Sequence, residues 1–382
     1  MEFDLQWLLL GLPVAFGLGW LASRLDLRQW KREVESSPRA YFKGLNLLLN
    51  EQQDKAIDAF IEAVQHDPGS SDLHFALGNL FRRRGEYERA VRVHQHLLSR
   101  ADLPTAERDR AQHALAQDFL KAGLFDRAEA AFRALEGTAF ATDARLALLG
   151  LYERSRDWAA AIEVAEQLEK SGTGSFAERS AHFHCELAQA ADDRGDAAAA
   201  EAALRRAREI APLAARPLVQ QAQRLVKQGR PAEALAVFAE LRQRNPQAFG
   251  RLAEDYVACA QAAGQPALAR STLEELFGTQ PRIDVLRALA RLEGCTPGES
   301  SRLLPLLREQ PSLSAALALL DSPAPAWPEG AQPAVRDAVA RAAKPLQRYR
   351  CAACGFEAQR HFWQCPGCLS WDSFPQQHVE EL

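Results

Sequence analysis

The sequence predicts an all-α solenoid of stacked helical hairpins, with a transmembrane helix before it and a small metal-binding ribbon after it. Three observations support this prediction. Small residues, bulky residues and prolines recur with a period near 34 residues, which is typical of helical repeats. An uncharged apolar run lies near the N-terminus. Two C-x-x-C pairs stand close together near the C-terminus.

The predicted anchor is Leu5–Ser23, a run of 19 residues without a charged side chain. A helix of that length crosses the roughly 30 Å hydrocarbon core of a bilayer. A cleaved signal peptide would carry basic residues before the apolar run, whereas Glu2 and Asp4 stand there. Four basic residues follow the run: Arg24, Arg28, Lys31 and Arg32. This charge bias predicts a single-pass protein whose bulk lies on the cytoplasmic side.

Three small residues of the anchor, Gly11, Ala15 and Gly19, are spaced four apart and share one helix face. Such a face lets a partner transmembrane helix pack closely, although small residues are also common in membrane helices generally. The spacing therefore indicates a packing surface and leaves a homo-oligomer open.

The repeat pattern is clearest in the first hairpin, where Gly44, Ala56, Phe60, Ala63 and Pro68 form a ladder. Small residues let two antiparallel helices approach, the bulky residue fills the next groove, and the proline ends the second helix. The ladder recurs six more times, and the corresponding first positions are Gly78, Ala116, Leu149, Ala188, Ala222 and Val257. The pattern resembles the tetratricopeptide repeat, whose hairpins must stack to bury their apolar faces.

Glycines predict the turns within the hairpins, because five of them lie seven residues after the first position of their repeats. They are Gly85, Gly123, Gly195, Gly229 and Gly264. The segment Arg282–Gln310 predicts a shortened eighth hairpin, and Ser312–Leu320 a further short helix. Ser322–Pro333 is rich in proline and is interpreted as a linker, with a helix expected at Ala334–Ala343.

The first helices of such pairs form a concave surface in solenoids of this type, where partners bind. Helical spacing therefore gives a set of candidate partner-binding residues. They are Tyr41, Leu45, Phe75, Asn79, Arg82, Arg83, Gln117 and Lys121. Any one of them is also compatible with ordinary solvated surface.

Cys351 and Cys354 form one C-x-x-C pair, Cys365 and Cys368 form the other, and ten residues separate the two pairs. Each pair predicts a tight turn whose backbone N–H groups point at the sulfur atoms. Four thiolates in a tetrahedron suit one Zn ion, or one Fe ion in a rubredoxin-like centre. A closed four-sulfur zinc site leaves no position for water, which predicts a structural role. Metal binding would also supply most of the folding free energy of so small a unit.

The ribbon carries more aromatic residues than a unit of its size can bury internally. They are Tyr349, Phe356, Phe362, Trp363, Trp371 and Phe374. We therefore expect the ribbon to dock against the helical array.

The composition excludes a general attraction to nucleic acid, because the net charge of the chain is −4. Seven cysteines are also too few for a disulfide scaffold in 382 residues. The three outside the ribbon, Cys185, Cys259 and Cys295, are interpreted as small core residues. His182 and His184 stand near Cys185, but residues two apart do not share a helix face, which argues against a metal site there.

The predicted domains follow in order. They are an anchor at 1–23, a juxtamembrane segment at 24–36, a repeat array at 37–321, a linker and short helix at 322–345 and a rubredoxin-like domain at 346–382.

Several runs of residues resemble one known family. They are Asn46–Ala56, Leu77–Gly85, Ala122–Glu129, Ala181–Ala188 and the tail Tyr349–Trp371. Together with the order of anchor, repeats and ribbon, they resemble the lipopolysaccharide assembly protein B family of Gram-negative bacteria. The resemblance covers nearly all of the chain.

The resemblance implies an inner-membrane adaptor that regulates lipopolysaccharide synthesis. Family members work with the membrane protease FtsH to control the level of LpxC, the deacetylase that commits the cell to lipid A. They are also thought to gather other lipopolysaccharide assembly proteins at the membrane. The sequence agrees with a protein that is not an enzyme, since it shows no P-loop, H-E-x-x-H, G-x-S-x-G or paired-carboxylate pattern.

Two other functions remain open at this point. The ribbon could hold iron and transfer electrons, which a red chromophore with reversible reduction would reveal. The repeat array could instead belong to a generic peptide-binding co-chaperone without a role in lipopolysaccharide synthesis.

Overall fold

The structure is a computed structural model that describes residues 16, 20, 42–309, 312–321 and 331–381. Gly11, Ala15, Gly19 and Tyr41 lie outside the described residues, as does the predicted anchor except for Phe16 and Trp20. No helix in the described part of the chain is both long and apolar enough to cross a membrane.

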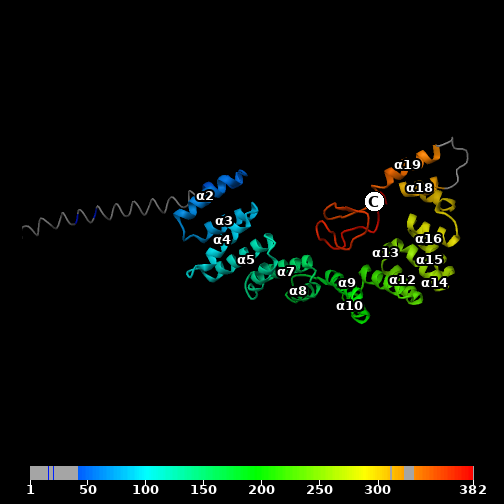
Figure 1. The fold of residues 1–382 in the computed structure, drawn as a ribbon, viewed down its shortest axis with the longest axis horizontal. Coiled ribbons are helices and arrows are strands. Elements are labelled where there is room, and N and C mark those ends of the chain that lie inside the picture. Colours follow the sequence, from blue (N-terminus) through cyan, green and yellow to red (C-terminus); the bar gives the residue numbers. More distant parts are fainter. Residues whose placement is uncertain (1–15, 17–19, 21–41, 310–311, 322–330, 382) are drawn as a thin grey trace, which may run out of the picture. The chain divides into compact units, whose positions relative to one another are not determined.

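The chain divides into two compact units. Figure 1 labels helices of both units, coloured along the sequence. The N-terminal unit comprises Met1–Ala160 and Lys170–Thr173, and the C-terminal unit comprises Ala161–Glu169 and Gly174–Leu382.

The N-terminal unit consists of paired antiparallel helices, as the repeat pattern predicts. Residues 42–49 are helical. The helices that follow are α2 (Gln53–His66), α3 (Ser71–Arg83), α4 (Tyr87–Ser99), α5 (Thr105–Lys121), α6 (Phe125–Arg133) and α7 (Ala141–Ser155). The next helix, α8 (Trp158–Lys170), is divided between the units, and most of it, Ala161–Glu169, belongs to the C-terminal unit.

The small residues of the ladder stand where helices meet. Ala56 and Ala90 are completely buried. A Cβ atom at Gly44 would lie 2.8 Å from Cε2 of Phe60, and one at Gly78 would lie 2.5 Å from Cε1 of His94. No side chain larger than hydrogen fits at these two positions without displacing an aromatic ring, so the structure explains the first rung of the ladder.

The five predicted turn glycines all have positive φ angles, between +69° and +80°. The fourth repeat has Arg156 at the same position, with φ +58°. An arginine there adopts the left-handed conformation that glycine accepts at lower cost. The turn geometry is therefore kept even where the glycine is missing.

The C-terminal unit contains further helix pairs. The first is α9 (Ala177–Asp193) with α10 (Ala197–Ile210), and the second is α11 (Ala215–Lys227) with α12 (Pro231–Arg244). The second helix of the next pair, the seventh, is α15 (Pro266–Thr279). The first helix of the seventh pair is interrupted at Leu252 and consists of α13 (Pro246–Arg251) and α14 (Ala253–Ala262). Phe249 and Tyr256, one on each side of the interruption, pack edge to face with ring centroids 5.0 Å apart. Both rings also pack against Phe238 of α12, which fixes the interrupted helix in the core.

The predicted eighth, shortened hairpin is confirmed. It contains α16 (Ile283–Glu293), the 3-10 turn η1 (Pro297–Glu299) and α17 (Leu303–Glu309), followed by α18 (Leu313–Leu320). The next helix, α19 (Ala331–Ala343), begins three residues earlier than expected and includes Pro333. Proline is tolerated in the first turn of a helix, because the N–H that it lacks has no partner there.

The ribbon, residues 346–381, contains strands β1 (Tyr349–Arg350) and β2 (Glu357–Ala358) and the C-terminal 3-10 turn η2 (Val379–Glu381). The two strands are antiparallel, with Tyr349 opposite Ala358 and Arg350 opposite Glu357. Within the C-terminal unit the ribbon, drawn in red in Figure 1, lies against the helices of the array.

Candidate metal centre and its docking interface

The four cysteines of the ribbon come together at the ends of two tight turns. The first turn follows β1 and contains Gly355 with φ +77°, and the second is followed by Leu369 with φ +61°. All four Sγ atoms lie within 4.8 Å of one another. Cys351 and Cys365 are buried, whereas Cys354 is exposed. The two turns thus form a single four-sulfur group at one end of the ribbon.

The spacing of the sulfur atoms fits one tetrahedral ion. The Sγ atoms of Cys351 and Cys368 are 3.7 Å apart, as are those of Cys354 and Cys365. Four sulfurs at about 2.3 Å from a central ion are separated by about 3.8 Å, as tetrahedral geometry requires. These cysteines could therefore bind one metal ion, and the geometry suits zinc and iron alike.

A backbone amide and two hydroxyl groups lie within hydrogen-bond distance of the sulfur atoms. The backbone N–H of Gly367 donates to Sγ of Cys365 at 3.4 Å, and the hydroxyls of Ser373 and Ser370 lie 3.2 Å and 3.3 Å from Sγ of Cys351 and Cys368. Burial raises the pKa of the Cys351 thiol, but the bonds from Ser373 and from backbone amides lower it further, to about 6. The surroundings of Cys351 thus favour its thiolate, the form that binds a metal ion. At Cys354 a bond from the backbone of Phe356 lowers the pKa, but hydrogen bonds with the other three cysteines raise it overall to about 12.

The predicted docking of the ribbon on the array is confirmed, and four of its six aromatic residues divide between two tasks, whereas Phe356 is 40% exposed. Tyr349 and Phe374 are buried with Cys351 and Cys365 in the core of the ribbon itself. Trp363 and Trp371 instead contact helices of the array.

His182, on the first turns of α9, is the first docking residue. Its ring stacks on Trp371 with centroids 4.6 Å apart and an interplanar angle of 17°. Its Nε2 atom forms a hydrogen bond of 2.5 Å with the carboxylate of Asp372. Only 2% of the His182 side chain is exposed, so the ribbon and the array enclose it.

Arg216, on α11, contacts both tryptophans. Its guanidinium carbon lies 5.9 Å from the ring centroid of Trp363 and 5.7 Å from that of Trp371, within the range of a cation–π interaction. Its Nη2 donates to the carboxylate of Glu186 at 2.5 Å. The ion pair holds the guanidinium near both rings.

Arg251, at the end of α13, extends the interface. Its guanidinium carbon lies 5.9 Å from the Trp363 ring centroid, and its Nε donates to Oε1 of Gln376 at 3.0 Å. Burial of Arg251 lowers its own pKa. The pKa of His361 falls to about 4, because His361 is buried and because the positive charge of Arg251 lies near it. His361 is therefore neutral at physiological pH inside the docked ribbon.

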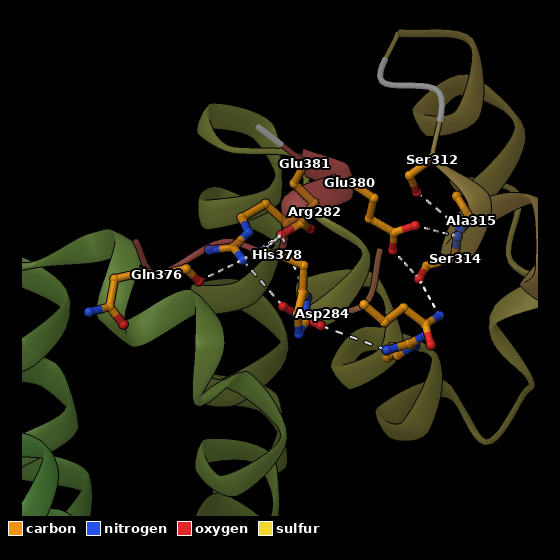
Figure 2. Close-up of polar contacts among 11 residues, drawn as sticks. Arg282, Asp284, Ser312, Ser314, Ala315, Gln376, His378, Glu380 and Glu381 are labelled. Carbon is orange, nitrogen blue, oxygen red and sulfur yellow. Dashed lines mark hydrogen bonds and ion pairs between the residues drawn. The ribbon is translucent and has the colours of Figure 1, made fainter. Parts of the chain in front are cut away.

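The last residues of the chain fasten the ribbon to α16 (Figure 2). Arg282, just before α16, is only 6% exposed. Its Nη2 donates to the carboxylates of Asp284 and Glu381 at 3.3 Å and 3.2 Å, and to the backbone carbonyl of Gln376 at 3.3 Å. A buried guanidinium thus depends on the C-terminal tail for one of its two carboxylate partners.

The same tail caps α18 (Figure 2). The carboxylate of Glu380 accepts a hydrogen bond from the backbone N–H of Ser314 at 3.3 Å and another from the Ser314 hydroxyl. These groups belong to the first turn of α18, where backbone N–H groups lack partners within the helix. Gln347, just before β1, also donates to the Ser314 hydroxyl at 2.8 Å. The tail therefore joins α16, α18 and the ribbon.

Sequence reasoning predicted that the ribbon docks but missed the residues that receive it. A signal was present in the repeats. His182, Arg216 and Arg251 each lie six residues before the first ladder position of their repeats, Ala188, Ala222 and Val257. Aligning the repeats would have shown three consecutive cationic or titratable residues at one position.

The candidate partner-binding residues lie in the N-terminal unit, except that Tyr41 is outside the described residues. Leu45, Arg83 and Lys121 are exposed, and Asn79, Arg82 and Gln117 are half-buried. Phe75 is different, because only 1% of it is exposed and it packs with Leu97, Leu103, Ala111 and Ala114. Its ring belongs to the core and is not available to a partner.

The scattered cysteines agree with the core interpretation at two positions. Cys185 and Cys259 are buried, and Cys295 is half-buried. Burial raises the pKa of the Cys185 thiol to about 12, which keeps it protonated and unreactive.

Family models match both the repeat array and the ribbon. A family model described as rubredoxin metal binding domain matches residues 349–376. Models described as tetratricopeptide repeat match residues 73–109, 113–176, 151–215 and 225–292. The predicted fold, a tetratricopeptide solenoid that ends in a rubredoxin-like ribbon, is therefore confirmed.

Relatives match along nearly the whole chain. Lipopolysaccharide assembly protein B of Escherichia coli strain K12 is 32% identical over 378 residues, which cover 97% of each chain. The protein of the same name from Haemophilus influenzae is 26% identical over 386 residues, also 97% of each chain. Among solved structures, a tetratricopeptide repeat protein from Parabacteroides merdae is 16% identical, with a TM-score of 0.35, and covers 68% of this chain and 98% of its own.

Proposed function

Because the chain belongs to the lipopolysaccharide assembly protein B family, we propose that it is an adaptor that regulates lipopolysaccharide synthesis. Specifically, it promotes the degradation of the deacetylase LpxC by the membrane protease FtsH and gathers other assembly proteins. The observation that carries this proposal is the end-to-end match of 32% identity, which includes both the repeats and the ribbon.

The site supports binding rather than catalysis. Among the described residues, the four cysteines are the one group of three or more His, Cys, Asp or Glu side chains that could hold a metal ion. A zinc ion with four thiolate ligands has no open position for water or substrate. In our proposal the metal is zinc, and it stabilises the ribbon while the repeats bind proteins.

The anchor is part of the same proposal. Leu5–Ser23 would hold the chain in the inner membrane, with both units on the cytoplasmic side. Gly11, Ala15 and Gly19 would form the face that packs against a transmembrane helix of the protease or of a second copy. Replacing all three with leucine should keep the anchor apolar and weaken co-purification with FtsH. An unchanged yield of FtsH would rule out this packing face.

Depletion of the protein in its own cells tests the adaptor function. The half-life of LpxC should lengthen several-fold, and lipopolysaccharide should accumulate, because the protease would lack its adaptor. Restoring the full chain should return the half-life to its normal value. An LpxC half-life that depletion leaves unchanged would contradict the proposed function.

Electron transfer is the second candidate, because the matching family model is that of a rubredoxin metal binding domain. The visible spectrum of the purified full chain separates the two functions. Iron bound by four thiolates would give a red chromophore that bleaches reversibly on reduction, whereas zinc gives no visible band.

A further inference from the structure

Three basic residues occupy one repeat position in the N-terminal unit. Arg83, Lys121 and Arg154 each lie five residues after the first ladder position of their repeats, in the last turns of α3, α5 and α7. All three side chains are exposed. Within the described part of the chain, none of the three forms an ion pair, whereas neighbouring cations such as Arg110 and Arg133 do. The row therefore presents uncompensated positive charge.

The three helices share one side of the unit, which we call the inner face. Arg82 of α3 donates to the carboxylate of Asp118 on α5 at 2.8 Å. His113 of α5 stacks on Phe140, the residue before α7, with ring centroids 4.8 Å apart. Burial lowers the pKa of His113. The carboxylate of Asp143 on α7 acts to raise this pKa, and the guanidinium of Arg82 on α3 acts to lower it, so charges from both neighbouring helices reach the ring. Residues at equal repeat positions thus follow one another along a continuous surface.

Two amide side chains stand beside the basic row. Asn79 and Gln117 each lie one residue after the first ladder position and are half-buried. Arg82 Nη2 donates to Oδ1 of Asn79 at 2.6 Å, which fixes the orientation of this amide. Its NH2 group is then the part left to act as donor, and an amide of this kind can bond the carbonyl of a peptide backbone.

The inner face also has an apolar point. Leu146 of α7 is 41% exposed, so its side chain offers apolar surface that a partner can cover. Cations, an oriented amide and an exposed leucine together fit a polypeptide better than a lipid headgroup, since phosphates would use only the cations.

We infer that the inner face of the N-terminal unit binds an extended, acidic segment of a partner protein. The carboxylates of the segment pair with Arg83, Lys121 and Arg154, its backbone bonds Asn79 and Gln117, and an apolar side chain covers Leu146. This inference rests on the proposed adaptor function and deepens it by naming the chemistry of the bound segment.

A fluorescent twelve-residue peptide of alternating glutamate and leucine tests the inference with the full chain in detergent. Fluorescence anisotropy should show saturable binding that weakens as the salt concentration rises, because the contacts are largely ionic. Peptides in which lysine or serine replaces every glutamate should bind at least about tenfold more weakly, the effect of about 1.4 kcal/mol in binding free energy.

Charge reversal of the row provides the decisive variant. The triple substitution Arg83→Glu, Lys121→Glu and Arg154→Glu should weaken binding of the acidic peptide by more than about tenfold. The matched control reverses three exposed cations on the second helices of the pairs, Lys55, Arg92 and Arg127, and should leave binding unchanged. Both variants change the net charge by the same amount, so a purely global charge effect would weaken binding in both.

Three results would overturn the inference. In the first, the row variant binds the acidic peptide as tightly as the natural chain. In the second, the row variant and the control lose peptide binding to the same extent. In the third, the row binds anionic phospholipid vesicles but the chain does not bind the peptide. Because cations at helix C-termini also stabilise the helix dipole, thermal unfolding of both variants is recorded to show that they are folded.

The failure of this inference and the failure of the proposed function are distinguishable. Peptide binding is measured on purified protein, whereas the adaptor function is measured by LpxC half-life after depletion. Suppose that depletion lengthens the LpxC half-life as proposed, but the row variant binds the peptide as tightly as the natural chain. That result would reject the inferred surface and leave the adaptor function standing.

Discussion

The two units use the same repeat architecture, but the basic row of the N-terminal unit and the residues that contact the ribbon in the C-terminal unit stand at different positions of the repeat. In the C-terminal unit, His182, Arg216 and Arg251 lie six residues before the first ladder position, and the ribbon of the same chain contacts all three. In the N-terminal unit that position holds Asp72, Arg110 and Asp143. A second ribbon would therefore find a carboxylate in place of the histidine and of one of the two arginines that it contacts in the C-terminal unit.

The basic residues of the N-terminal unit lie eleven positions further along each repeat, at Arg83, Lys121 and Arg154. The corresponding residues of the C-terminal unit are Asp193, Lys227 and Ala262, which form no basic row. The comparison teaches that one helical scaffold carries two different binding surfaces. One receives a domain of the same chain, and we propose that the other receives a partner.

The largest expected effect comes from removing the metal, which should unfold the ribbon in the C-terminal unit and leave the N-terminal unit unchanged. Changing Cys351 and Cys354 to serine replaces two thiolates with hydroxyls, which bind zinc or iron poorly. Metal content should fall from one ion per chain to none, and residues 346–381 should become sensitive to protease, because metal binding supplies the folding free energy of such a unit.

The helical array should survive this change, since the stability of stacked repeats is a sum over repeats and their neighbours. Far-UV circular dichroism should stay close to that of the natural chain. A large loss of helical signal would show that the ribbon is needed to fold the array. Normal LpxC turnover by the metal-free variant would show that the ribbon is dispensable for the adaptor function.

Equivalent arginines in the two units sharpen the comparison. Arg216→Ala removes a side chain that is 11% exposed and contacts Glu186, Trp363 and Trp371. We expect it to weaken ribbon docking by about 2 kcal/mol, the size of a desolvated cation–π interaction, because its ion pair with Glu186 lies within the array and does not reach the ribbon. Arg110→Ala, at the same repeat position, removes a side chain that is 49% exposed, and should cost less than about 1 kcal/mol.

Limited proteolysis within residues 322–330 checks the docking in both arginine variants. After cleavage, the ribbon fragment should stay bound to the array in Arg110→Ala and separate from it on a sizing column in Arg216→Ala. Equal retention in both variants would show that the cation–π contacts contribute little to docking.

Two glycines test the core of the N-terminal unit without touching the ribbon. A Cβ atom at Gly78 would lie 2.5 Å from the ring of the buried His94, so Gly78→Ala should destabilise this unit by about 1–3 kcal/mol. Gly150 lies in α7 with nothing within 4 Å of the added atom, and Gly150→Ala should stabilise the unit by up to about 1 kcal/mol through helix propensity. Urea unfolding measures the stability of both variants, and hydrogen exchange in α3 and α7 locates the change. A Gly150→Ala variant that is less stable than the natural chain would contradict the open space seen around Gly150.

The smallest effect is expected at the C-terminal tail. Glu380→Gln removes the charge that caps α18 and should cost about 1 kcal/mol, the usual range for a helix cap. Hydrogen exchange should speed up in the first turn of α18 and stay unchanged in α3. No change at Ser314 would show that the tail lies beside α18 without stabilising it.

The periodic part of the fold was predictable because each hairpin repeats the same local requirements. Gly78 and Ala90 mark a close helix contact, and Gly85 marks the turn between them, all within one repeat. The metal site was equally local, since Cys351 to Cys368 span 18 residues with ligand spacing.

The interface depends on residues that are far apart in the sequence, and this is why it escaped prediction. His182 and Asp372 are separated by 190 residues, and neither is unusual in its own segment. The burial of Phe75 escaped for a related reason, because its cover comes from Leu97 and Ala111 on the two following helices. Local spacing identifies which face a residue shares but not what later packs on that face.

Photo-cross-linking in cells tests the central claim, that one surface receives the ribbon and the other a partner, most directly. A photoreactive amino acid is placed at Lys121 on the inner face, at Arg127 on a second helix as control, and at Gln220 on α11 in the C-terminal unit. We predict adducts with LpxC or FtsH from position 121, none from 127, and cross-links confined to the same chain from 220. Adducts with either protein from 127 or 220 but not from 121 would contradict the account.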